Sequence, residues 1–446
     1  MKKQHETHIQ YKHRVIDTVS GSFCAAKWLN ATVWLGDGRT ASCHHPVAHQ
    51  VNLATIADDP SALHNTDQKK YARKQMLEGI RPSECEYCWK IEDMGRDSVS
   101  DRVFKTIIYD DDTISDISKT PWSQNINPKT LEIAFDRTCN FACSYCNASF
   151  STTWGNDIKK NGPYRGLVSD GAGAFIGDGS NSQPYRDSED NPYIQAFWKW
   201  WPELSKDLEE LRITGGEPLM SPDVWRLLDY FIENGMGDTR LAINSNLGAK
   251  DSFMDRFVEK AQALGSIDLY TSCEAMGEHA EYIRDGLNWD KFIHNCERMM
   301  REGNLRTFNM MMTVNSLCLF SITDFWDLML DWKEQYGDKA PVWSVNILRF
   351  PSFQSALVLP TEIKDRAREH IREWFDGSRQ HHMKEMERDG IRRLIDYLEV
   401  VDDPHGNVSP IETRQQDFKS FFKQYDSRRG KDLRAVFTEL AEWVNK

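Results

Sequence analysis

Three cysteines lie close together in the stretch TCNFACSYCN, with three residues between the first pair and two between the second. They are Cys139, Cys143 and Cys146. Thiolates are soft ligands that suit zinc and iron–sulfur clusters. Three thiolates are one short of the set that closes a four-iron cluster, so one iron would stay open to bind a substrate or cofactor directly. The stretch therefore predicts a metal centre with an open coordination position.

A second group of four cysteines precedes the first. Cys24 and Cys43 flank a predicted hairpin, and the stretch ECEYC adds Cys85 and Cys88. Four cysteines would close a tetrahedral zinc shell, and so would three cysteines with one histidine. The histidines near enough in sequence are His44, His45 and His49. We expect these histidines to serve the surface or a substrate channel instead.

Strand-like and helical runs alternate between about residues 131 and 350. The strand-like runs are LEIAF, ELRIT, RLAIN, IDLYT, FNMMMT and VWSVNIL, and helical stretches such as DVWRLLDYFIENG separate them. This alternation predicts parallel strands with crossover helices. Six strands are enough for a partial (β/α)6 barrel of the TIM type, in which active sites form at the C-terminal ends of strands. The cysteine triplet follows the first of these strands.

The segments on either side of the barrel have different patterns. The stretch NATVWLGDGRTASC has two β-type runs around a Gly-Asp-Gly turn, which predicts a hairpin. Residues 360–446 are mostly helical in pattern, and PTEIKDRAREHIREWF opens on a proline that suits a helix start. We therefore expect an α/β chain with a small cysteine-rich N-terminal domain (1–120), the partial barrel (121–355) and a helical C-terminal region (356–446).

Two further stretches lie within the barrel region. Residues 161–193 are rich in Gly, Ser, Asn and Asp without periodicity, which predicts a loop, either a lid or a surface excursion. The stretch YIQAFWKWWPEL could form an aromatic binding platform, but a common helical face favours core packing. The side chains on that face are Ile194, Phe197, Trp198, Trp201 and Leu204.

Composition limits the class of protein. The 446 residues carry a formal net charge of −13, which argues against a general electrostatic grip on nucleic acid and favours a small-molecule or peptide partner. No run of about 18 apolar residues offers a membrane span. The first twenty residues lack the apolar core of a secretory signal, so we expect a cytoplasmic, reducing location. There, clustered cysteines indicate metal rather than disulfides.

The triplet resembles the Cys-x3-Cys-x2-Cys motif of radical S-adenosylmethionine (SAM) enzymes, including the aromatic Tyr145 before the third cysteine. The resemblance implies that the three thiolates hold a [4Fe-4S] cluster whose open iron chelates the amino and carboxylate groups of SAM. It also implies an electron donor such as flavodoxin or ferredoxin, and cleavage of SAM to methionine and a 5'-deoxyadenosyl radical. The protein then positions the cofactors and the substrate and excludes water.

Other stretches resemble the SAM-binding motifs of this family, in the same order. RITGGEPLM matches the GGEP motif, whose backbone and carboxylate hold the amino group of SAM. AINSN resembles the ribose-contacting stretch, and YTSCEAMGEHAEYIRDG resembles the fourth-strand segment that reaches the ribose or carboxylate of SAM. For the last two stretches, capping or surface ion pairing is the alternative. The residues implied are Gly215, Gly216, Glu217, Pro218, Ser245, Asn246, Ser272 and Arg284.

The family's adenine motif has no clear match in MMMTVNSLCLF, so adenine contacts stay unassigned. The remaining cysteines lie in strand or helix patterns and are expected to be small buried hydrophobes. They are Cys273, Cys296 and Cys318.

The second cysteine group, with Gly38 five positions before Cys43, resembles the auxiliary-cluster modules called SPASM and twitch domains. The resemblance implies that Cys24, Cys43, Cys85 and Cys88 hold a second [4Fe-4S] cluster. The usual module follows the barrel, whereas here it precedes the barrel. Together, the resemblance spans about residues 20–350.

These motifs favour a radical SAM oxidoreductase with two [4Fe-4S] clusters that abstracts hydrogen from a peptide or peptide-like substrate. The auxiliary cluster would aid electron transfer, and a peptide is favoured because such modules are common in peptide-maturing relatives. One alternative is radical dehydrogenation of a small alcohol or aminosugar. Another is a non-catalytic iron–sulfur protein that responds to redox state, although a sensor has no need of a GGEP motif.

Overall fold

The computed structural model describes residues 2–95, 98–185, 188–400 and 409–445, and its chain divides into two compact units. Unit 1 comprises residues 1–136, 184–213 and 237–240. Unit 2 comprises residues 137–183, 214–236 and 241–446. Both units combine segments from separate parts of the sequence. The three consecutive domains expected from the sequence remain a prediction.

Unit 1 contains strands in the order β6-β4-β1-β2-β3. β1 and β4 pair in parallel, whereas β2 pairs antiparallel with both β1 and β3. The strands are β1 (Asn30–Trp34), β2 (Arg39–Ala41), β3 (His49–Gln50), β4 (Thr130–Ala134) and β6 (Glu210–Thr214). The predicted hairpin is therefore confirmed. At its turn Gly38 has φ +74°, and a Cβ there would lie 2.0 Å from Cζ of Tyr193, so both conformation and space require glycine.

The described part of unit 1 also contains helices. They are α1 (His8–Tyr11), α2 (Asp17–Val19), α3 (Ala26–Leu29), α4 (Leu53–Asp58), α5 (Asp67–Leu77), α6 (Glu86–Asp93), α7 (Asp101–Thr106), α8 (Asp111–Lys119) and α10 (Pro192–Leu204). The aromatic stretch predicted to pack in the core forms α10. Its side chains Ile194, Phe197, Trp201 and Leu204 are buried as expected, while Trp198 is only half-buried.

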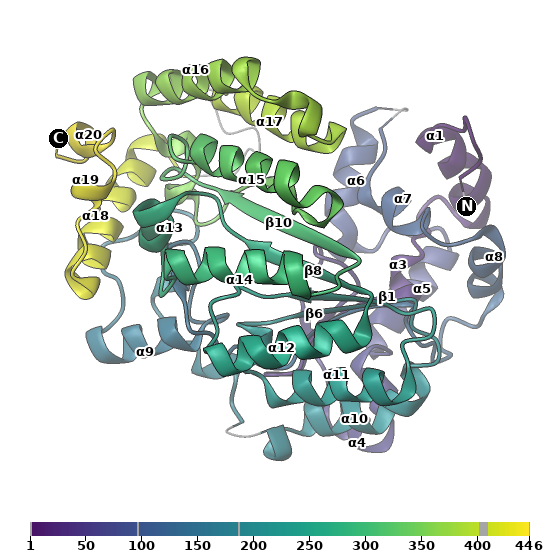
Figure 1. The fold of residues 1–446 in the computed structure, drawn as a ribbon. Coiled ribbons are helices and arrows are strands. Elements are labelled where there is room, and N and C mark those ends of the chain that lie inside the picture. The colour runs from purple at the N-terminus through teal and green to yellow at the C-terminus, as the bar shows by residue number, and fades with distance from the viewer. Residues whose placement is uncertain (1, 96–97, 186–187, 401–408, 446) are drawn as a thin grey trace. The chain divides into compact units, whose positions relative to one another are not determined.

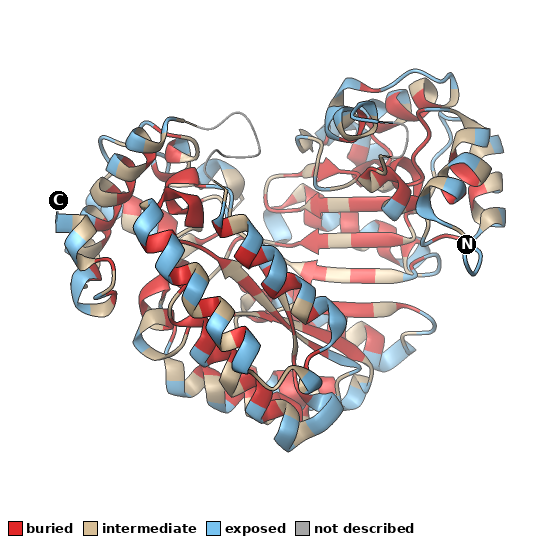
Figure 2. Cartoon of the chain, turned by 90° about the horizontal axis from the view of Figure 1, so that it is seen from above, coloured by how far each residue is buried: buried red, intermediate tan, exposed pale blue. Residues whose placement is uncertain are grey.

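Unit 2 contains four parallel strands in the order β11-β10-β8-β7. They are β7 (Arg240–Asn244), β8 (Ile267–Ser272), β10 (Thr307–Val314) and β11 (Val342–Ile347). The helices before, between and after them are α9 (Thr152–Asn161), α11 (Pro222–Asn234), α12 (Asp251–Leu264), α13 (Gly277–Ile283), α14 (Trp289–Glu302) and α15 (Ile322–Tyr336). Figure 1 shows α12, α14 and α15 lying along the strands of this unit. In Figure 2 the strands are mostly buried, while the helices alternate between buried and exposed positions.

All six strands predicted for the barrel are present as β4, β6, β7, β8, β10 and β11. The chain therefore has the expected mixed α/β fold with mostly parallel strands. Within each unit the described strand order has two ends, so the described strands do not form a closed barrel. This arrangement is consistent with a partial barrel.

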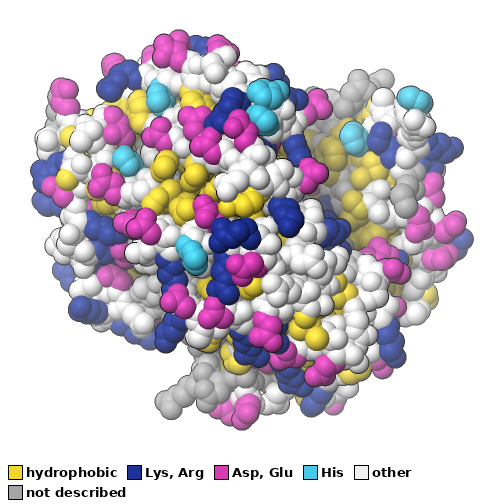
Figure 3. Space-filling model, viewed as in Figure 1, with side chains coloured by type: hydrophobic (Ala, Val, Ile, Leu, Met, Phe, Trp, Pro, Cys, Tyr) yellow, Lys and Arg dark blue, Asp and Glu magenta, His cyan; other side chains and the backbone are white. Residues whose placement is uncertain are grey.

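The C-terminal region is helical where the structure describes it, as expected; residues 401–408 and 446 lie outside the described residues. Its helices are α16 (Thr361–Gly377), α17 (Glu385–Leu398), α18 (Ile411–Arg429), α19 (Leu433–Val436) and α20 (Ala441–Asn445). Over the described ranges, no helix combines the length and apolar character needed to cross a membrane. On the face drawn in Figure 3, acidic and basic side chains are interspersed.

The predicted loop at 161–193 has little regular structure before α10 begins, and residues 186–187 lie outside the described part. It contains short 3-10 turns, and its first half is anchored within unit 2. Asp417 on α18 accepts hydrogen bonds from the amide and hydroxyl of Ser169 at 2.7 and 2.6 Å, and the Tyr164 ring stacks on Phe421. This half of the loop is therefore fixed to the C-terminal region.

Candidate cluster and cofactor site

The cysteine triplet lies on a loop of unit 2 whose backbone is held from both sides. A short strand β5 (Ala142–Cys143) pairs antiparallel with β9 (Arg284–Asp285) and places Cys143 opposite Arg284. The amide of Ser144 donates to the carbonyl of Ile283 at 2.7 Å. These hydrogen bonds fix the direction of the loop between the first and last cysteines.

Helix α9 and the C-terminal region also bind this loop. The indole of Trp154 donates to the carbonyl of Cys143 at 2.9 Å, and the amide group of Gln354 donates to the carbonyl of Ser144 at 2.9 Å. The hydroxyl of Tyr425 lies 3.3 Å from the carbonyl oxygen of Ala142. The loop of the cysteine triplet is thus ordered by neighbours far away in the sequence.

The pKa values of the three thiols are raised above that of a free cysteine. Burial raises the pKa of Cys143 to about 11 and that of Cys146 to about 12, and it raises the pKa of Cys139 further still. The charge of Cys143 adds to the shift at both of the other thiols. A bound metal reverses this balance because coordinated thiols are deprotonated. The donor set therefore fits a cationic centre.

The GGEP turn lies directly against the start of the cysteine loop. The amide of Glu217 donates to the carbonyl of Thr138 at 2.6 Å. A Cβ on Gly216 would lie 2.3 Å from the same oxygen, so only glycine allows this approach. Gly215 has φ +131°, and Pro218 is buried at the start of a 3-10 turn. The motif thereby packs its backbone beside Cys139.

The carboxylate of Glu217 is 1% exposed and connects the GGEP turn to the segment after β7. One oxygen, Oε1, accepts from the hydroxyl of Ser245 at 2.7 Å and from the amide of Leu219 at 3.1 Å. The other, Oε2, accepts from the amide of Asn246 at 2.7 Å. Burial raises the pKa of Glu217 to about 7, against the effect of these hydrogen bonds.

Asn246 lies beside the first cysteine. Its Nδ2 donates to Oδ1 of Asn140 at 2.9 Å and lies 4.0 Å from Sγ of Cys139. Its Oδ1 accepts from the amide of Gly248 at 2.8 Å. Ser245, in contrast, is buried and faces Glu217. The structure therefore brings both predicted positions into the same network as the GGEP turn.

A buried ion pair stands beside the loop. Arg284 donates to Oε2 of Glu274 through Nε at 3.1 Å and through Nη2 at 2.5 Å. The hydroxyl of Tyr145 donates to Oε1 of the same carboxylate at 3.1 Å. Ser272, at the end of β8, is half-buried two residues before Glu274. Sequence reasoning missed Glu274, although an acidic residue just beyond a strand end was an available signal.

Three of the remaining cysteines are fully buried, as predicted for small hydrophobes. Cys273, Cys296 and Cys318 are each 0% exposed.

The four cysteines of unit 1 line one cavity. Burial raises the pKa of Cys85 to about 11 and that of Cys24 to about 12, and it also raises those of Cys43 and Cys88. Cationic side chains share the cavity wall, and they are Lys27, Arg102 and Lys105. Segments far apart in sequence thus bring the four predicted ligands to one place.

The three candidate histidines have different surroundings. His45 lines the cavity of the cysteines. His49 lies 2.8 Å from the hydroxyl of Thr66. His44 is mostly exposed and lies 3.2 Å from Asp101.

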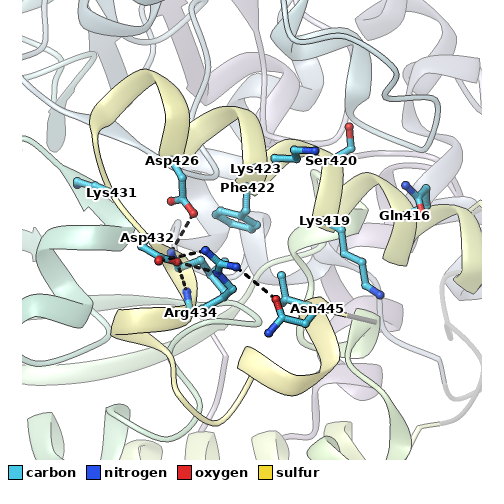
Figure 4. Close-up of a pocket in the computed structure, with 12 residues that line it drawn as sticks. Gln416, Lys419, Ser420, Phe422, Lys423, Asp426, Lys431, Asp432, Arg434 and Asn445 are labelled. Atoms are coloured by element: carbon cyan, nitrogen blue, oxygen red, sulfur yellow. Dashed lines mark hydrogen bonds and ion pairs between the residues drawn. The ribbon is translucent and has the colours of Figure 1, made fainter.

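A separate polar pocket lies in the C-terminal helices of unit 2 (Figure 4). Lys419 and Lys423 from α18 border it, and Arg434 pairs there with Asp432. Its lining includes none of the cysteines or the predicted SAM-binding residues.

The chain was compared with known proteins. No curated protein matches the chain. A solved structure, native anSMEcpe with bound AdoMet and Cp18Cys peptide, is similar at 12% identity over 58% of this chain and 60% of that chain, with a TM-score of 0.32. The model of the Radical SAM superfamily matches residues 133–317, which include the cysteine triplet, the GGEP turn and Arg284. Members of this superfamily are enzymes that use SAM-derived radicals and bind SAM and a [4Fe-4S] cluster. Residues 133–317 are therefore similar to the Radical SAM superfamily.

Proposed function

We propose that the chain is a radical SAM oxidoreductase that reductively cleaves SAM and abstracts hydrogen from a peptide or peptide-like substrate. The observation that carries this proposal is the contact between the GGEP turn and the cysteine loop within unit 2. The hydrogen bond from Glu217 to Thr138 puts a predicted SAM contact next to the residue before Cys139. When bound, the cluster and SAM supply the 5'-deoxyadenosyl radical.

In this proposal Cys139, Cys143 and Cys146 hold the [4Fe-4S] cluster. Their loop is held by β9 and by the side chains of Trp154 and Gln354, which supports thiols that are positioned before a cluster binds. Such preorganisation lowers the cost of ordering ligands around a metal.

Glu217 would receive the ammonium of SAM. An ionised carboxylate offers about four acceptor sites, and the protein hydrogen bonds to Glu217 use three of them. A cation favours the ionised form, which burial alone disfavours. The backbone at Gly215 and Gly216 would approach the same ligand, and Pro218 fixes the turn that follows.

The other predicted positions would contact the remaining groups of SAM. Asn246 would reach the ribose from its place beside Cys139, supported by Ser245 within the same turn. Arg284 would bind the carboxylate: its guanidinium has five N–H donors, and Glu274 takes only those on Nε and Nη2. Tyr145 holds Glu274 from the other side, and Ser272 ends the neighbouring strand.

We assign the cavity of unit 1 to an auxiliary [4Fe-4S] cluster that aids electron transfer. Cys24, Cys43, Cys85 and Cys88 would be its ligands, and the lysine and arginine side chains of the cavity wall would balance the charge of the thiolates. A zinc ion is the competing occupant. An electron donor such as flavodoxin or ferredoxin would reduce the protein in the cytoplasm.

The anaerobically reconstituted, reduced protein should convert SAM to 5'-deoxyadenosine. Replacing Cys139, Cys143 and Cys146 together with Ala should abolish this conversion because the cluster loses its thiolates. Cys296→Ala, which removes a buried thiol of α14, should retain it. Chromatography of the nucleoside products measures the outcome. Formation of 5'-deoxyadenosine by the triple variant at the parental rate would refute the cluster assignment.

Loss of the Glu217 charge should weaken SAM binding. Charge-assisted hydrogen bonds contribute about 1.5–3 kcal/mol, so Glu217→Gln should raise the Kd for SAM by roughly ten- to a hundredfold while cluster absorbance persists. Glu217→Ala should weaken binding at least as much, since the Asn246 amide also loses its partner. Titration of the reconstituted protein with SAM gives the affinities. Equal affinities in the parent and Glu217→Gln would remove Glu217 from the SAM site.

Metal analysis determines whether the cavity of unit 1 holds an iron–sulfur cluster or zinc. The protein should carry about eight irons and eight sulfides per chain, and the variant without the first three cysteines should retain about four of each. Replacing Cys85 and Cys88 with Ala should remove the second set and loosen unit 1, because metal-binding energy is partly folding energy. Elemental analysis and Mössbauer spectra decide the occupant. Zinc without iron in the variant that lacks the first three cysteines would overturn the two-cluster proposal.

A further inference from the structure

Two histidines and an aspartate converge beside Cys43 in unit 1. Nε2 of His45 lies 2.7 Å from Oδ2 of Asp101, and Nε2 of His44 lies 3.2 Å from the same oxygen. One ligand atom from each residue lies within 4.8 Å of the other two. Three side chains thus present two nitrogens and one oxygen toward a common point.

This convergence requires a bent backbone. Side chains of adjacent residues in an extended chain point to opposite faces. Here the chain bends after β2, and the rings of His44 and His45 lie 4.0 Å apart. The ring of His45 is also stacked on Tyr87 from α6, at 3.8 Å between centroids. The donors are therefore held together by separate segments of the unit.

We propose that His44, His45 and Asp101 form a site for a divalent first-row transition-metal ion, such as zinc or ferrous iron. Imidazole nitrogens suit these ions, whereas calcium and magnesium prefer shells built from oxygen. Three protein ligands leave at least one coordination position for water or a substrate group. The site is distinct in chemistry from the neighbouring cysteines because it contains no sulfur.

The site of His44, His45 and Asp101 faces solvent on one side and the cysteine cavity on the other. The side chain of His44 is 62% exposed, which admits an ion from solvent. His45 and Asp101 line the cavity of Cys24, Cys43, Cys85 and Cys88. A metal held here would thus lie at the edge of that cavity, where its open position could bind a carboxylate, amine or hydroxyl group. The inference stands whether or not the proposed radical chemistry does, because it uses only groups of unit 1.

Zinc binding by the full-length protein tests this site. The parent is first reconstituted anaerobically with iron and sulfide, then dialysed against Zn²⁺ beside three variants: His44→Ala, Asp101→Asn and the control His13→Ala. His13 is an exposed partner of Asp17 at 2.9 Å, so it matches the histidine–aspartate pairing outside the site. The parent and the control should each bind one zinc per chain more than either site variant, or bind it more than about tenfold more tightly. Iron and sulfide contents should be equal in all four proteins.

X-ray absorption at the zinc edge identifies the ligands. The account predicts a shell of nitrogen and oxygen at about 2.0–2.1 Å, without sulfur at about 2.3 Å. A sulfur shell on the zinc that is lost in His44→Ala would overturn the proposal, because the histidine would then belong to the cysteine site. Equal zinc binding by all four proteins, or loss of iron in the site variants, would overturn it as well.

Discussion

The candidate SAM site depends on the hydrogen bonds to the buried carboxylate of Glu217. Its two oxygens accept hydrogen bonds from Ser245, Asn246 and Leu219, while its own amide binds the carbonyl of Thr138. Removing the carboxylate would leave two amides and a hydroxyl without their partner, each costing about 1–3 kcal/mol. The side chain of Glu217 therefore sets the spacing between the GGEP turn and the segment after β7, and its backbone amide joins the turn to the cysteine loop. In our proposal the same carboxylate also meets the cation of SAM, so structure and binding share one group.

The two cysteine groups show the same electrostatic pattern in different surroundings. In both, burial raises the pKa of the thiols, and a bound metal would supply compensating positive charge. The loop in unit 2 has three cysteines and a neighbouring ion pair, Arg284 with Glu274. The cavity in unit 1 has four cysteines and several cationic side chains. In our proposal this difference corresponds to an open site in unit 2 and a closed site in unit 1.

Local sequence patterns predicted most of the elements. Strands such as LEIAF and RLAIN, the hairpin around Gly38 and the cysteine loop depend on periodicity, turn chemistry and short spacing, which are visible in one segment. The contacts of Glu274, Gln354 and Tyr425 were not predicted. All three lie more than a hundred positions away in sequence from the cysteine-loop residues that they contact. Similarly, Trp200 is buried beside the face assigned to α10, because packing on both sides of a helix widens its buried face.

The sequence patterns also did not predict the division of the chain into these two compact units. Residues 184–213, which include α10 and β6 almost to its end, cluster with the N-terminal segments rather than with the rest of the barrel pattern. Side chains such as Tyr193 against Gly38 and Asn191 against the carbonyl of Leu35 explain this grouping. Such contacts depend on shape at long range, and composition shifts along the chain do not report them.

The central claim is that three thiolates leave one iron open to SAM beside Glu217. Electron–nuclear double resonance on the reduced protein with SAM labelled with ¹⁵N at its amino group tests this claim most directly. The account predicts a hyperfine coupling between the cluster and the labelled nitrogen, which disappears when unlabelled SAM replaces it. A cluster signal without that coupling, in protein shown by titration to be saturated with SAM, would contradict the account.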